Sequence, residues 1–254
     1  MPSFSTHGLS QALTFPFRGS KFLIACLVTF STFLIPIVPY LALRGYSYRI
    51  MRRVLQEDGQ LEMPEWDDWG QFLKDGLRLW GANLVYSLPL LVMWAGMFTL
   101  YALFMITLIA ASAGRESDIL AAFSVLGAFF PVLLGVVMLV MMIFQAVLYF
   151  FLPAANAHLA AKDRFGAAFA VGEWGRVLKA NFGGFAILFL LSVGGYIVFT
   201  FAFQFLYMTM VLCALLPFVS AAFIAYATLV VDGLSALLYR EGLERQAAEA
   251  DGSQ

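Results

Sequence analysis

Charge is scarce in this sequence. Asp, Glu, Lys and Arg make up 12% of its 254 residues, whereas apolar residues make up 62%. A soluble domain carries about 25% charged and roughly 45–50% apolar residues. A chain this poor in charge cannot cover itself with polar surface in water, so the composition predicts a protein surrounded by lipid. The net charge of −1 provides no basic field, which argues against nucleic-acid binding.

Sequence patterns for catalysis and metal binding are also missing. The chain contains no CxxC, HExxH, GxSxG or Walker pattern and no N-glycosylation sequon. Its two cysteines, Cys26 and Cys213, both lie inside apolar runs, where cysteine usually packs as a small apolar side chain. The sequence therefore predicts no disulfide, no bound metal or cofactor, and no enzymatic activity.

Long apolar runs dominate the rest of the chain. Each main run reaches the roughly 20 helical residues that cross a hydrocarbon core of about 30 Å. Residues 79–112 exceed one crossing, and we interpret them as one long helix bent at Pro89 and Gly96. We expect an all-α, polytopic integral membrane helix bundle with a single domain, 1–240, and a polar C-terminal tail, 241–254. The spans are predicted at about 22–43, 79–112, 131–155, 183–212 and 217–239.

Three polar segments separate or precede these spans and are predicted to lie at the interface as amphipathic helices: about 3–17, 44–78 and 162–181. Arg44–Arg78 carries six Lys or Arg residues and 162–181 carries four, which favours the cytoplasmic side of a prokaryotic inner membrane. With the C-terminus also inside, five spans require an external N-terminus, which the early bases Arg18 and Lys21 disfavour. If the segment 22–43 re-enters instead of crossing, four spans remain and both termini are cytoplasmic.

Two of the polar segments resemble each other. Asp68–Lys74 reads DWGQFLK and Glu173–Lys179 reads EWGRVLK, with acid, Trp, Gly, Leu and Lys at matching positions. Tryptophan favours the lipid–water interface, and lysine reaches toward lipid phosphates. The pattern indicates an internal duplication of an element that seats the chain at the interface.

The stretch between Pro36 and Pro89 carries a family resemblance. Its motifs run Gly45-Tyr46, then Arg49-Ile50-Met51-Arg52-Arg53, then MPEWDDW at 63–69, then Asp75-Gly76-Leu77 and Tyr86-Ser87-Leu88-Pro89. This order resembles an uncharacterised prokaryotic membrane family, domain of unknown function 4013, with Met63 in place of the usual Leu. The resemblance covers roughly residues 10–220. It implies a multi-pass membrane protein and supplies no activity or catalytic residue.

Several polar side chains are candidate contacts or sites. Asp232 is the one carboxylate well inside an apolar run, and a charge there needs a partner or a function. We expect a basic partner such as Lys162, Arg164 or Lys179. The acidic residues between Glu57 and Asp68 lack the ligand spacing of a Ca²⁺ loop and are predicted to be solvated. The predicted contacts with anionic lipid or a protein partner are Arg49, Arg52, Arg53, Trp66, Trp69, Lys74, Trp174 and Lys179.

These observations favour a non-enzymatic integral membrane protein, such as an accessory, scaffold or assembly subunit. Its expected partners are membrane lipids with anionic head groups and a protein partner or a second copy of the chain. The alternative is a small transporter or channel that uses Asp232. A more remote alternative is pigment or haem binding through His158, the one histidine near a span.

Overall fold

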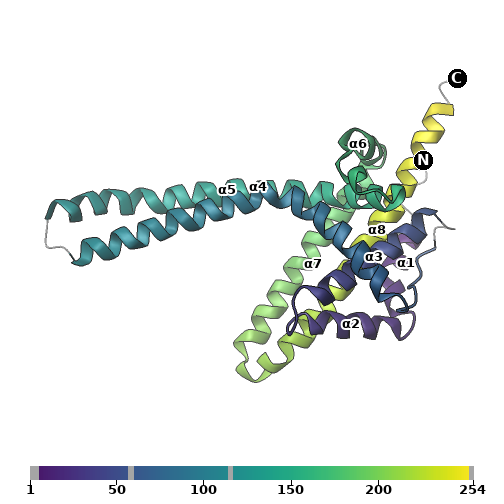
Figure 1. Ribbon diagram of the computed structural model, residues 1–254, viewed down its shortest axis with the longest axis horizontal. Helices are drawn as coiled ribbons and strands as arrows, with labels where there is room; N and C mark the ends of the chain where they lie inside the picture. Colours follow the sequence, from purple (N-terminus) through teal and green to yellow (C-terminus); the bar gives the residue numbers. More distant parts are fainter. Residues whose placement is uncertain (1–5, 57–59, 114–116, 252–254) are drawn as a thin grey trace. The chain divides into compact units, whose positions relative to one another are not determined.

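The computed structural model describes residues 6–56, 60–113 and 117–251, and these residues form α-helices and short 3₁₀ helices without any β-strand (Figure 1). The predicted all-α fold is therefore confirmed. The α-helices are α1 (Thr6–Thr14), α2 (Lys21–Ser31), α3 (Val38–Gln56), α4 (Trp69–Ala113), α5 (Ser117–Lys162), α6 (Val171–Ala180), α7 (Phe182–Met208) and α8 (Leu216–Asp251). The 3₁₀ helices are η1 (Phe15–Phe17), η2 (Phe165–Phe169) and η3 (Met210–Leu215).

The helices belong to two compact units rather than to the one domain predicted for 1–240. Unit 1 comprises the chain up to Asn83 and again from Phe150 onward, and unit 2 comprises Leu84–Tyr149. Helices α4 and α5 each begin or end in unit 1 and extend through unit 2. The division is invisible in the sequence because it falls inside two uninterrupted helices.

Four helices are long and apolar enough to cross a membrane: Trp69–Ile109, Phe129–Lys162, Phe182–Met208 and Cys213–Asp251. They overlap four of the five predicted spans, although the helix that begins at Phe182 ends at Met208, before the predicted limit at residue 212. The predicted span 22–43 is not one helix, because α2 ends at Ser31 and α3 begins at Val38. Prolines 36 and 39 explain the break, since the first ends α-helical geometry at the residue before it. The preceding pair, Leu9–Phe17 and Lys21–Ser31, is bent by 76°.

Unit 1 is built around α8, which contacts α1, α2, α3, α6 and α7. Figure 1 shows α7 and α8 running side by side, and Phe199 stacks on Phe223 between them at 4.0 Å. Helix α3 contributes the fully buried Tyr46 and Tyr48. The segment 44–78 is thus not a single amphipathic helix, because its first part belongs to α3 in the unit 1 core and its last part to α4.

The other predicted interfacial segments also pack into unit 1. Within 3–17, of which residues 3–5 lie outside the described part of the chain, Ala12 and Phe15 are buried. Within 162–181, α6 turns its apolar face onto α8 and buries Trp174. The tail predicted at 241–254 continues α8 as a helix as far as Asp251. The apolar faces of these segments therefore pack against other helices of unit 1.

Unit 2 is a pair of apolar helical segments from α4 and α5. Phe104 stacks on Phe130 at 3.9 Å across the pair. The outward faces carry large exposed apolar side chains such as Val92 and Val132. On α5 the less exposed positions repeat with the three- and four-residue spacing of a helix–helix seam. These positions are Phe130, Leu134, Val137, Met141 and Phe144.

Candidate functional site

Asp232 on α8 is one of two carboxylates that are nearly fully buried among the described residues, the other being Asp75 on α4. Its side chain accepts hydrogen bonds from Arg44 Nη1 at 2.9 Å and from Ser47 Oγ at 2.6 Å, both on α3. Asp232 is only 4% exposed, so this carboxylate is removed from water and compensated by a charge and a hydroxyl. The basic partner expected for Asp232 is present, but it is Arg44 and none of the three bases predicted. The arrangement locks α3 to α8.

A polar seam continues along the same two helices. Ser235, one turn beyond Asp232, donates to the Asp232 carbonyl oxygen and lies 3.7 Å from Met51 Sδ on α3. Arg44 Nε is buried without a hydrogen-bond partner, which leaves one donor of the ion pair unused. The seam therefore holds charge at a helix crossing and is closed by α3 and α8 themselves.

Residues 61–68, called the strap below, cover the outer side of α3. The ring of Trp66 stacks on Tyr46 at 3.9 Å, and the Tyr46 hydroxyl donates to the Pro64 carbonyl at 2.8 Å. Burial is the main cause that raises the pKa of Tyr46 above its usual value, with the Glu65 charge second. Pro64 and Trp66 of the MPEWDDW motif therefore cover the buried Tyr46 of α3.

Arg49 joins the strap to the start of α4. Its Nη1 lies 3.0 Å from Asp67 Oδ1, its Nη2 lies 3.7 Å from Asp68 Oδ2, and its guanidinium sits 4.4 Å from the centre of the Phe72 ring. The pKa of Asp67 is lowered mainly by its own backbone N–H, with Arg49 also contributing. The acidic residues Asp67 and Asp68 therefore serve as partners for arginine. Glu57 and Asp58 of the same run lie outside the described residues.

Asp163 ties three helices together at the end of α5. Its carboxylate accepts from the Tyr48 hydroxyl at 3.0 Å and from Arg78 at 2.9 Å, and Arg52 lies 3.8 Å away. Burial and the Asp163 hydrogen bond raise the pKa of Tyr48. Asp163 has a φ of 47°, the left-handed conformation that often ends a helix. The hub links α3, α4 and the end of α5.

His158 is buried between α6 and α8. Its Nδ1 lies 2.5 Å from the Tyr239 hydroxyl, and its Nε2 lies 3.3 Å from Glu173 Oε2. The second contact places the carboxylate beside the ring without the geometry of a hydrogen bond. Because both ring nitrogens face protein groups, neither is presented to a haem or chlorin. This geometry does not favour the pigment alternative.

Two glycines bring α3 and α4 into backbone contact. A Cβ added at Gly45 would lie 1.7 Å from the Phe72 carbonyl oxygen, and one at Gly76 would lie 1.9 Å from the Leu41 carbonyl oxygen. Only a residue without a Cβ fits at these points. Both glycines lie in the family motifs, so this crossing gives them a physical reason.

The same pair of contacts recurs around the second copy of the repeat. A Cβ on Gly242 of α8 would lie 2.8 Å from the Val177 carbonyl oxygen, and Asn181 Nδ2 donates to the Leu238 carbonyl at 2.9 Å. In each copy the third and seventh residues after the tryptophan make the contacts: Phe72 and Gly76 in the first, Val177 and Asn181 in the second. Their partners form a Leu-x-x-x-Gly pattern on the neighbouring helix, Leu41 to Gly45 or Leu238 to Gly242. The recurrence supports the predicted internal duplication, with the partner helix before one copy and after the other.

The residues predicted to contact lipid or a partner are placed very differently from one another. Lys74 and Lys179 are exposed, Trp69 is 47% exposed, and Arg53 is partly exposed. Arg49 and Arg52 have carboxylate partners. Trp174 is 5% exposed and donates its Nε1–H to the Ala168 carbonyl, so its predicted lipid contact is wrong.

Most of the residues that complete these networks were not predicted from the sequence. Their partners are far apart in the chain, as in the pair formed by Arg44 and Asp232. Local patterns contain no signal for such pairs. The missed residues are Arg44, Ser47, Tyr48, Asp163 and Tyr239.

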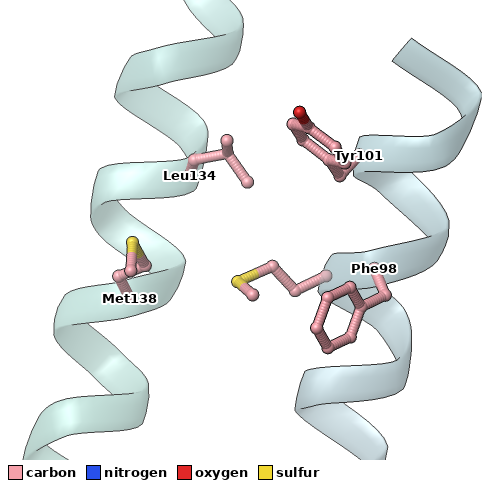
Figure 2. Close-up of a pocket in the computed structure, with 5 residues that line it drawn as sticks. Phe98, Tyr101, Leu134 and Met138 are labelled. Atoms are coloured by element: carbon pink, nitrogen blue, oxygen red, sulfur yellow. The ribbon is translucent and has the colours of Figure 1, made fainter. Parts of the chain in front are cut away.

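Unit 2 contains a cavity of about 270 Å³ between α4 and α5. Figure 2 shows Phe98 and Tyr101 on one helix facing Leu134 and Met138 on the other across this space. Met97 completes the lining. Such an apolar lining suits hydrocarbon and offers no charged group to a polar substrate.

Comparison with known proteins gives one match. No curated protein and no solved structure is similar enough to this chain to be matched. A family model does match, over residues 28–208, which includes the α3–α4 crossing, the strap and both copies of the repeat. The chain therefore belongs to the family described as Protein of unknown function (DUF4013).

Proposed function

We propose that this protein is a non-enzymatic integral membrane protein that acts as an accessory, scaffold or assembly subunit through contacts made within the membrane. The observation that carries the proposal is the exposure of the helices that form unit 2. In the most apolar window of α4 no side chain is buried inside the chain, and in that of α5 only 6% are. The corresponding share in α8 is 22%. Unit 2 thus offers two helix surfaces for lipid and for other membrane helices.

The length of these helices supports association. After Arg78, α4 continues uncharged for roughly 50 Å at ~1.5 Å per residue, whereas a hydrocarbon core is about 30 Å thick. An excess of about 20 Å costs a fraction of a kcal/mol for each ångström if it is not accommodated. Tilting and contact with neighbouring helices relieve this cost. A partner or a second copy along unit 2 meets that need.

The distribution of Lys and Arg along the chain supports a proposed orientation in the membrane. The concentration of Lys and Arg in Arg44–Arg78, in 162–181 and after Arg240 favours the cytoplasmic side of a prokaryotic inner membrane for these segments and for the C-terminus. Exposed Lys74 and Lys179 are the better candidates for anionic lipid head groups, because Arg49 and Arg52 already face carboxylates.

The test is the composition of the complex in its own lipid. The tagged chain is extracted into native nanodiscs without detergent and weighed by native mass spectrometry. We expect several copies of the 28.1 kDa chain, or the chain with a second protein at fixed stoichiometry. A single 28.1 kDa chain with lipid alone contradicts the proposal.

Two equally exposed valines provide a matched control. Val92 in unit 2 is 70% exposed and Val198 on α7 is 69% exposed. Val92→Trp should weaken the association if unit 2 is the contact surface, and Val198→Trp should leave it unchanged. Equal effects of the two substitutions argue against a specific role for unit 2.

A further inference from the structure

The two ends of the apolar segment 22–43 are attached to the same strap. Before the segment, Lys21 Nζ donates to the Met63 carbonyl at 2.9 Å and pairs with Glu65 at 2.6 Å. After it, the Tyr46 hydroxyl donates to the Pro64 carbonyl at 2.8 Å. Because these strap residues are consecutive, the chain that leaves at Lys21 has returned to the same place by Tyr46.

The path between these ends is too short for two crossings. Helix α2 has 11 residues, or about 16 Å at ~1.5 Å per residue, roughly half of a ~30 Å hydrocarbon core. A turn over residues 32–37 follows, and α3 starts at Val38. From there to Arg44, whose charge is paired with Asp232, the helix rises only about 9 Å.

Four backbone N–H groups of the turn are hydrogen-bonded within the chain and so need no water. The amides of Thr32, Phe33, Leu34 and Ile35 all donate to carbonyls of α2, from Thr29, Phe30 and Ser31. Two prolines, at 36 and 39, carry no N–H at all. The amides of Ile37, Val38 and Tyr40 lie outside this pattern. Irregular backbone is excluded from hydrocarbon because its polar groups go unpaired, and the four hydrogen-bonded amides lower that cost for this turn.

The hydroxyl groups beside the turn are also hydrogen-bonded to backbone carbonyls within the chain. Thr29 Oγ1 donates to the Ala25 carbonyl, Ser31 Oγ to the Val28 carbonyl, and Thr32 Oγ1 to the Thr29 carbonyl. Each hydroxyl is thereby satisfied within its own helix and needs no water.

The side chains at the turn are apolar and exposed. The exposed fractions are 53% for Phe33, 78% for Leu34, 59% for Ile35 and 66% for Ile37. In water, the exposed apolar surface of this cluster would carry an unfavourable free energy of hydration. Acyl chains suit both these apolar side chains and a turn whose first four amides are already hydrogen-bonded.

We infer that residues 22–43 form a re-entrant helical hairpin, which inserts Phe33–Ile37 among the acyl chains and returns to the side of the strap without crossing the bilayer. Together with four crossing helices, this places the N-terminus, the strap and the C-terminus on one side. The inference rests on the membrane placement in the proposed function and not on the scaffold role.

The test is cysteine accessibility in oriented membrane vesicles. Cys26→Ala and Cys213→Ala first remove the native thiols, and then Ser10→Cys, Leu34→Cys and Gln60→Cys are introduced one at a time at exposed positions. A membrane-impermeant maleimide is added from either side. We expect Ser10→Cys and Gln60→Cys to react from the same side and Leu34→Cys to react from neither.

Two other outcomes overturn the inference, and a control separates it from the membrane placement. Reaction of Ser10→Cys and Gln60→Cys from opposite sides means that the segment crosses. Reaction of Leu34→Cys from the strap side means that the turn lies in water. Val92→Cys in unit 2 is the membrane control: if it is also labelled, the membrane placement itself fails, and if it stays protected, only the re-entrant hairpin fails.

Depth provides an independent readout on the same variant. A fluorophore attached at Leu34→Cys is measured in vesicles whose lipids carry bromine at a shallow or a deep acyl position. We expect quenching by these lipids, whereas a fluorophore at Ser10→Cys should be quenched far less. Equal quenching of the two sites contradicts insertion of the turn.

Discussion

The closest packing in unit 1 is the α3–α4 crossing, and Gly45→Ala tests it. The new Cβ would lie 1.7 Å from the Phe72 carbonyl oxygen and 2.5 Å from its carbonyl carbon. A carbon–oxygen contact needs about 3.3 Å, so the helices must separate by roughly 1.6 Å. The obstacle is backbone and not a side chain that can rotate away. Tyr46, which packs on Phe72, moves with the helix.

The expected magnitude combines two opposing terms. Overpacking a tight core costs about 1–3 kcal/mol, and a backbone clash belongs at the upper end. Alanine regains about 1 kcal/mol of helix propensity over glycine. We therefore expect Gly45→Ala to lower the free energy of unfolding by about 2 kcal/mol, which is a factor of about 30 in the folded-to-unfolded ratio.

The assay is equilibrium unfolding in mixed micelles, followed by tryptophan emission, since Trp66 stacks on Tyr46 beside the crossing. Gly175→Ala on α6 is the matched control, because nothing lies within 4 Å of its added Cβ. That variant should be neutral or slightly stabilised. Gly45→Ala with Gly76→Ala should cost less than the sum of the single changes, since one separation relieves both clashes. If Gly45→Ala is as stable as the control, the reasoning is refuted.

Three further results are expected in the same unfolding assay. Asp232→Leu should cost about 3 kcal/mol because it strands the Arg44 charge, and adding Arg44→Met should restore most of the loss. Trp174→Phe should cost about 1–2 kcal/mol, since it removes a buried hydrogen bond and leaves a carbonyl unpaired. Stability should also decline above pH 10. The pKa values of Tyr46 and Tyr48 are raised above 10.0 in the folded chain, so only the unfolded chain ionises there readily.

Each of these expectations has an opposite outcome. An Arg44→Met, Asp232→Leu double variant that is no more stable than Asp232→Leu would show that the pair does not act as a unit. A fully stable Trp174→Phe would place the ring outside the core. Stability that is unchanged between pH 9 and pH 11, against a Tyr46→Phe control, would show that ionisation of the buried tyrosines does not affect folding.

The long helices were predictable from the sequence for a simple reason. The apolar content of 79–112, 183–212 and 217–239 is continuous, and continuous apolar length is the strongest single signal in a chain. The segment 22–43 passed the same length test, and the sequence left open whether it crosses or re-enters; the structure divides it between α2 and α3. Pro36 and Pro39 already marked its end, but only the contacts of Lys21 with the strap show that the chain returns.

The candidate site was less predictable because its pairs depend on which helices meet. Asp232 stood out in the sequence, yet its partner Arg44 lies on a helix far away in the chain. The two repeat tryptophans show the same limit: Trp69 is half exposed and Trp174 is buried, although their local sequences match. The side chains packed around the two tryptophans in space differ, and a local sequence motif carries no information about them.

The central claim is that unit 2 makes specific contacts within the membrane, and site-directed photocrosslinking in living cells tests it most directly. A photoreactive amino acid replaces Val92 or Val132 in unit 2, or the equally exposed Val198 on α7. The account predicts one protein adduct of constant mass from the unit 2 positions and lipid adducts alone from Val198. Lipid adducts alone at all three positions would contradict it.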